Sequence, residues 1–235
     1  DLHKEYRRQR QMCIRDRANA STVGFGFRPI KMVGQAYNNA GLSEYSVAAS
    51  SALISHACLV QLTANGVVLA AGNGGANNLG TLNGVFYTDA TSNKPTFSNF
   101  SPASNTATDI VAFVNDNPQQ MFEVMSADTA FNQNEVGHCA DQVLDVGVTP
   151  LFISKSKVSA TTAAAIAQLK ILGVSRDPDH SDTTAEGFAL RVMIDEHLLG
   201  KASMNLDLEH PIGIFPEMFV VPIVFLFLFR HHEIV

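Results

Sequence analysis

The sequence lacks most of the signals that would assign it an activity. It contains no Cys-x-x-Cys pair, no His-x₃-His spacing and no Gly-Lys-Ser/Thr phosphate loop, so no zinc or nucleotide motif is visible. It also shows no internal repeat and no alternation of strands with helices. We therefore predict that the chain is not an enzyme, and we expect no catalytic residue, no cofactor-binding residue and no metal ligand.

Basic charge and cysteine are scarce between residues 18 and 200. This stretch holds 8 Lys and Arg against 15 Asp and Glu, a net charge of −7. Nucleic-acid binding relies on clustered Lys and Arg, so we expect no nucleic-acid partner. Cys58 and Cys139 are the two cysteines there, and a single pair does not indicate a disulfide framework.

Long apolar runs are also missing. The longest, Met218–Phe229, has twelve residues and includes Pro222. A membrane-spanning helix needs about 20 such residues. The first 30 residues contain no continuous apolar core of the kind a secretion signal has. We expect no membrane partner.

The two ends differ in character from the middle. Arg10–Arg17 resembles translated sequencing-adapter sequence, so we expect residues 1–17 to be artefactual and leave them out of the fold prediction. A basic arm for nucleic acid is the alternative. We expect residues 201–235 to be a non-native or disordered tail, with a partner-binding strand or a membrane anchor as alternatives.

What remains is a β-rich domain over residues 18–200, in which short apolar runs alternate with turn residues. Strands are predicted at 25–33, 43–49, 59–62, 67–70, 81–89, 96–100, 110–114, 121–125, 169–174 and 188–194. We predict a mainly β fold, a compact antiparallel β-barrel or sandwich with one or two short helices and an extended N-terminal arm over Ala18–Gly26.

Turn residues and side-chain alternation refine this prediction. Asn65 and Gly66 favour a hairpin between the third and fourth strands. Residues 115–118 favour a second hairpin between 110–114, expected to be apolar on both faces, and 121–125. Pro29 predicts an edge or a bend. In 188–194, the even-numbered residues are predicted to face inward and Arg191 outward. A helix or an irregular crossing is expected at 134–144, and a helical turn at 161–167.

Several polar clusters are candidate sites. We expect Gly72–Gly80 to be a surface loop, because Asn77 stands where a dinucleotide motif has its third glycine. We expect Asp177–Asp182 to be a solvated loop rather than a calcium site. Three further groups are expected to be structural: His138, Cys139 and Asp141; His56 and Cys58 as a packed pair; and Asp195, Glu196 and His197 at a surface strand end. Asn99–Ser101 matches a glycosylation acceptor without a secretion signal to support it.

Several segments, in order, resemble a family of structural proteins from tailed bacteriophages. They are 26–31, 84–89, 94–98, 110–118, 122–124 and 168–173, followed by a strand ending at Glu196 and His197. The resemblance covers about residues 21–200. It implies a head-associated virion protein of the decoration or cement type, assembled in the host cytoplasm, without catalytic residues. Its implied partners are the major capsid protein and further copies of itself, which could form a trimer.

Two other functions stay open at this point. The first is a receptor- or glycan-binding module of a phage fibre, with Tyr37, Tyr45 and Tyr87 as exposed contacts. The second is a hydrolase, which would require Glu123, His138 and Asp141 to converge in one cleft.

Overall fold

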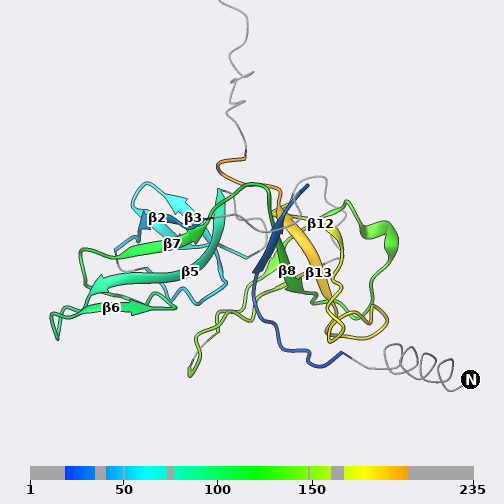
Figure 1. Cartoon of the computed structure of the whole chain (residues 1–235), viewed down its shortest axis with the longest axis horizontal. Helices are drawn as coiled ribbons and strands as arrows, with labels where there is room; N and C mark the ends of the chain where they lie inside the picture. The colour runs from blue at the N-terminus through cyan, green and yellow to red at the C-terminus, as the bar shows by residue number, and fades with distance from the viewer. Residues whose placement is uncertain are drawn as a thin grey trace, which may run out of the picture. The chain divides into compact units, whose positions relative to one another are not determined.

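A computed structural model describes residues 19–34, 41–49, 51–72, 77–147, 149–159 and 167–200. These residues form two large antiparallel sheets (Figure 1), a two-stranded ladder and one short 3-10 helix, η1 (Gln133–Glu135). The predicted mainly β fold is confirmed, and it is a sandwich rather than a closed barrel. Within the described ranges, no helix has the length and apolar character that crossing a membrane requires.

The first sheet has the strand order β1-β8-β13-β12-β9. Its strands are β1 (Arg28–Met32), β8 (Gln120–Met125), β13 (Ala189–Ile194), β12 (Leu169–Val174) and β9 (Cys139–Ala140). β1 lies at the edge, and its register shifts between Pro29 and Lys31, so the predicted effect of Pro29 is confirmed. A separate two-stranded ladder joins β10 (Gln142–Val143) to β11 (Lys157–Val158).

The second sheet has the order β2-β7-β5-β3-β4, with β6 also paired to β5. Its strands are β2 (Ser43–Ser46), β7 (Val111–Asn115), β5 (Asn78–Thr88), β3 (Leu59–Thr63), β4 (Gly66–Leu69) and β6 (Pro95–Ser98). The sheet curls until β2 and β4 approach each other, where Val47 and Val67 form a single parallel bridge. One bridge is not a continuous ladder, so the barrel stays open.

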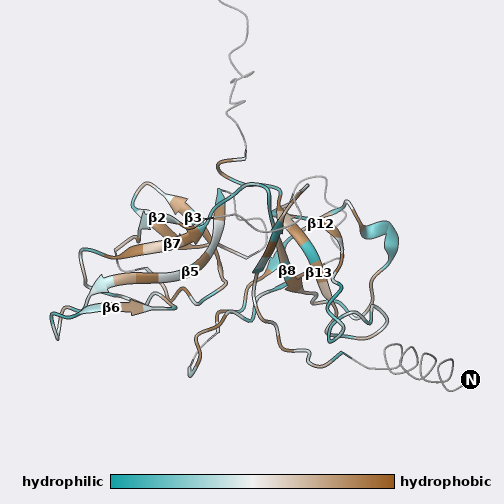
Figure 2. Ribbon diagram, in the orientation of Figure 1, coloured by the Kyte–Doolittle hydropathy of each residue, from teal (hydrophilic) through white to brown (hydrophobic). Residues whose placement is uncertain are grey.

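Two apolar clusters stabilise these layers, and β3 contributes to both. Leu59 joins the cluster with Phe27, Phe122 and Phe188, which fills the space between the two sheets. Its neighbour Val60 points the opposite way, into the cluster enclosed by the curled second sheet. Successive strand residues face opposite sides, so β3 separates the two cores. Figure 2 shows hydrophobic residues along the strands of both sheets and hydrophilic residues around η1.

Three strand predictions are confirmed in detail. β3 and β4 form a hairpin in which Thr63 pairs with Gly66, and Gly66 has the positive φ of +119° that the turn requires. β12 has the predicted bounds. The inward residues of the predicted strand at 188–194 are all buried, whereas Arg191 is half-buried on the other face.

The predicted hairpin across residues 115–118 is wrong. β7 lies between β2 and β5 in the second sheet, whereas β8 lies between β1 and β13 in the first. The connection therefore crosses between sheets. The burial prediction is also reversed, because β7 alternates between half-buried and buried residues while every residue of β8 is buried. β8 is covered on both faces.

The structure corrects the bounds of one predicted loop and decides between the two alternatives for residues 134–144. The predicted loop Gly72–Gly80 ends earlier, because Asn78, Leu79 and Gly80 are the buried start of β5. Residues 134–144 are an irregular crossing that contains the end of η1, β9 and the two residues of β10. The helical turn expected at 161–167 lies almost wholly outside the described residues, as do the segments at 1–17 and 201–235.

The predicted N-terminal arm is described from Asn19 onward, and it is bound to its own chain. Asn19 donates side-chain hydrogen bonds to the carbonyls of Asp182, Ala185 and Glu186. The Ala20 amide donates to the Asp179 carbonyl at 2.8 Å. This segment therefore anchors the loop that precedes β13.

Candidate functional site

The acidic segment 177–182 works as a structural loop. Asp177 accepts a hydrogen bond from the Asp179 amide and lies 3.4 Å from the Arg28 guanidinium. Asp182 accepts hydrogen bonds from the amide and hydroxyl of Thr184, which lower the pKa of its carboxyl. Among the described residues, no group of three or more His, Cys, Asp or Glu could hold a metal ion.

The three residues that a hydrolase would need do not come together. His138 is exposed before β9, and Asp141 follows β9, accepting a hydrogen bond from the Gln168 amide. Glu123 is on β8, and β13 and β12 lie between it and β9. With strands about 4.8 Å apart, three spacings separate these groups by about 14 Å.

Burial raises the pKa of the Cys139 thiol, and nearby Asp195 raises it further.

A charged row crosses the outer face of the first sheet instead. Glu123 is 6% exposed and stands opposite Arg28 on β1 and Arg191 on β13. Its carboxylate accepts hydrogen bonds from Arg28 and from the Ser175 hydroxyl. Arg191 donates to the Val174 carbonyl. Each of the three charged side chains has a hydrogen-bond partner within the fold, so we interpret the row as a structural network.

Phe25 extends this network towards the acidic loop. The Arg28 guanidinium lies 4.8 Å from the centre of the Phe25 ring, a cation–π contact. The Phe25 ring lies 5.7 Å from that of His180, and the His180 Nδ1 atom is 2.8 Å from the Gly187 carbonyl. These contacts fix the segment before β1 against the loop before β13.

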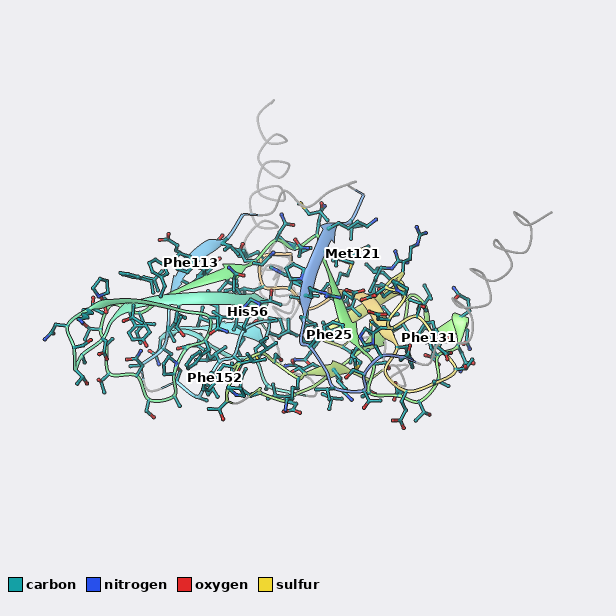
Figure 3. All side chains as sticks on the ribbon, turned by 60° about the horizontal axis from the view of Figure 1, so that its bottom comes forward. Phe25, His56, Phe113, Met121, Phe131 and Phe152 are labelled. Carbon is teal, nitrogen blue, oxygen red and sulfur yellow. The ribbon has the colours of Figure 1, made fainter. Side chains whose placement is uncertain are left out.

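A cavity of about 360 Å³ lies beside this segment, where β1 meets β5 and the end of β7. Its walls include the apolar residues Phe25, Phe27, Pro29 and Ile153 and the polar residues His56, Thr81, Asn83 and Asn115. In the prediction, His56 and Cys58 share a face. The positive φ of 60° at Ala57 interrupts that alternation, so His56 lines the cavity while Cys58 packs in the core of the second sheet. Figure 3 shows His56 and Phe25 in the central part of the molecule.

The prediction that His197 marks a surface strand end is wrong. His197 is 2% exposed and forms a parallel bridge with Asn78 at the start of β5. Its Nδ1 atom accepts a hydrogen bond from the Leu199 amide. Burial lowers the pKa of His197, and the Asp116 carboxylate opposes that shift. The last described turn is therefore folded into the second sheet.

Two of the three tyrosines that are expected to contact a glycan make contacts within the fold. The Tyr45 hydroxyl donates to Asp116 at 2.6 Å, and burial followed by this contact raises the pKa of Tyr45 to about 12. Tyr45 and Tyr87 both pack against the core of the second sheet. Tyr37 lies outside the described residues.

Three phenylalanines share one face of β5, β6 and β7, where Phe97 is exposed and Phe86 and Phe113 are half-buried. The ring centres of Phe86 and Phe97 are 4.8 Å apart, and those of Phe97 and Phe113 are 6.2 Å apart. Phe97 is 75% exposed. We call these three residues the phenylalanine stripe. Spacing within the sequence does not reveal it, because strand pairing brings the three rings together.

Comparison with protein-family models, curated proteins and solved structures found no match to this chain. The resemblance to the phage family therefore stays a prediction from the sequence.

Proposed function

We propose that the chain is a non-enzymatic structural protein of a phage virion that binds the outer surface of the capsid and stabilises the shell. Its partners are the major capsid protein and neighbouring copies of itself. The observation that carries this proposal is the combination of a free strand edge with the phenylalanine stripe. The ordered segments that resemble the phage family support it independently.

The free edge belongs to β6. Within the described residues, β6 pairs with β5 alone, so its other edge has backbone donors and acceptors without a ladder partner. Such an edge can accept a strand from another chain, with alternate side chains supplying specificity. Phe97 lies in the middle of this edge strand and exposes most of its ring. A partner strand added to β6 would cover apolar surface and satisfy backbone groups together.

The exposure of the phenylalanine stripe also favours a partner-binding role over a purely structural one. Phe97 leaves three quarters of its surface exposed, although burying a phenylalanine side chain contributes about 1.5–3 kcal/mol. The described fold does not gain this free energy at Phe97, but a partner that buries the ring would. In a shell, repeated neighbours would cover such edges in every copy.

The test is to mix the full chain with phage capsids that lack this protein and to examine them by cryo-electron microscopy. Ordered density at symmetry-related sites, with β6 at the contact, supports the proposal. We expect Phe97→Ser to weaken capsid occupancy at least tenfold. Leu199→Ser, which removes an exposed apolar side chain beyond the opposite end of β5, should leave occupancy unchanged.

Two results would overturn the proposal. Absence of binding by the folded wild-type protein would remove the capsid as its partner. Ordered binding that is equal in Phe97→Ser and wild type would show that the phenylalanine stripe is not the contact. Circular dichroism of both variants checks that any loss of binding is not a loss of folding.

A further inference from the structure

The cavity between β1 and β5 contains a buried polar group without a partner. Asn115 is 5% exposed, and its Oδ1 atom has no hydrogen-bond partner among the described residues. Asn115 stands opposite Thr81 in the β5–β7 ladder, and both residues line the cavity. Directly opposed residues of a ladder point to the same face. An unpaired buried acceptor destabilises the fold, and a donor bound in the cavity would remove that cost.

His56 supplies a second acceptor to the same space. Its Nδ1 atom lies 3.0 Å from the Asn83 carbonyl oxygen, and a carbonyl can only accept, so Nδ1 carries the proton. In the neutral ring, Nε2 then offers a lone pair. The Thr81 hydroxyl adds a group that can donate or accept. The polar part of the cavity is therefore suited to a ligand that brings its own hydroxyl or N–H donors.

The charges around the cavity exclude an ionic ligand as the natural occupant. Among its lining residues, Arg28 is the one with a permanent charge. That guanidinium is already paired with Glu123 and Asp177 and lies over the Phe25 ring. An anion would have to compete with two carboxylates for Arg28, and a cation would find no free carboxylate in the lining.

The remaining walls are apolar, and the volume suits a small ring. Phe25, Phe27, Pro29 and Ile153 form most of the non-polar lining. About 360 Å³ is at the lower end of the range for small-molecule sites, which combine apolar walls with a few placed polar groups. A sugar ring has the matching construction, with an apolar C–H face and hydroxyl donors at its rim.

We propose that this cavity binds a neutral saccharide ring. Its C–H face packs on Phe25, the half-buried phenylalanine of the lining, and its hydroxyls donate to Asn115 Oδ1 and His56 Nε2. The site uses other residues than the phenylalanine stripe, so substitutions at Asn115 and at Phe97 test saccharide binding and capsid binding separately.

The test is a titration of the ¹⁵N-labelled full chain with methyl glycosides of glucose, galactose and N-acetylglucosamine, followed by amide chemical shifts. For at least one glycoside, we expect saturable shifts at His56, Thr81 and Asn83. Asn115→Leu should weaken binding at least tenfold, and Thr81→Val should weaken it several-fold. Thr88→Val makes the same change on the same strand outside the cavity, and it should bind like wild type.

Stability provides a second readout. Because Oδ1 is unpaired in the free protein, Asn115→Leu should leave the unfolding midpoint unchanged or raise it, whereas a residue kept for the fold would lower it. If Asn115→Leu does not fold, Thr81→Val alone decides the binding test. No saturable shift with any of the three glycosides, or equal affinity in the cavity variants and wild type, would overturn the proposal. Neither result bears on capsid binding, which is tested through Phe97.

Discussion

Replacing Gly80 with alanine tests the architecture of the second sheet most directly. Gly80 is in β5, where β7 ends, and it pairs with Val60 of β3. A Cβ atom added at Gly80 would lie 1.9 Å from the Asn115 carbonyl oxygen and 2.7 Å from its carbonyl carbon. Both neighbours are backbone atoms, so no side-chain rotation can relieve the contact. The glycine is required here by close approach of the chains.

The cost of Gly80→Ala follows from the displacement it demands. Moving the oxygen from 1.9 Å to 3.0 Å, the shortest separation that real Cβ atoms tolerate, requires the strands to part by about 1.1 Å. A ladder hydrogen bond of about 2.9 Å would lengthen to about 4.0 Å, which is no longer a hydrogen bond. Two such bonds at about 1 kcal/mol each, plus residual overpacking, give a loss of about 2–4 kcal/mol.

Gly41→Ala is the matched control. Gly41 is exposed, and no atom of the described residues lies within 4 Å of a Cβ atom added there. Its φ is also outside the positive region, so alanine should be neutral or stabilise by up to about 1 kcal/mol through the unfolded state. Urea unfolding of the two variants and wild type measures both changes. If the free energy of unfolding of Gly80→Ala lies within about 0.5 kcal/mol of the wild-type value, the close approach of β5 and β7 at Gly80 is refuted. Such a small change is expected for the surface loop that the sequence predicts.

Three further predictions concern buried groups. Burial lowers the pKa of His197 in the folded chain, so the unfolded chain binds its proton first and stability should fall as the pH drops below about 7. His197→Gln should flatten that slope in urea midpoints. Arg28→Met leaves the Glu123 carboxylate without its cation, and because Arg28 is half exposed we expect a loss of about 2 kcal/mol by the same measurement. Phe188→Ala should cost about 3–5 kcal/mol, whereas Phe97→Ala should stay within about 0.5 kcal/mol in thermal unfolding.

Local features of the fold were predictable because they depend on neighbouring residues. The alternation in β13 assigned its buried face, since a strand places successive side chains on opposite sides. The hairpin between β3 and β4 followed from Asn65 and Gly66, because the turn needs a positive φ. Pro29 marked an edge, since proline cannot donate to a central ladder.

The connection after β7 shows where such reasoning ends. Asn117 and Pro118 favour a turn, but a turn can join two paired strands or lead a chain from one sheet to the other. The deciding factor was burial. β8 has apolar side chains on both faces and sits between two strands of the first sheet, whereas β7 covers the core of the second. Neither partner is close in sequence.

The candidate sites depended on the same distant pairings. Arg28 and Glu123 meet because β1 pairs with β8. Asn115 reaches the cavity because β7 pairs with β5, and His197 is buried because the final turn packs at the start of β5. In the sequence, His197 is one of three polar residues after a strand, which is the usual pattern of a surface end.

By itself, the sequence determined the class of the fold, the strands with clear alternation, one hairpin and the acidic character of residues 18–200. The tertiary structure decided which strands pair, which phenylalanines stay exposed and which polar groups enclose a cavity. The physical reason is the separation in the sequence between the residues that interact. Side-chain alternation and turn geometry act over a few residues, whereas strand pairing and burial are set by segments tens of residues apart whose contacts stabilise one arrangement collectively.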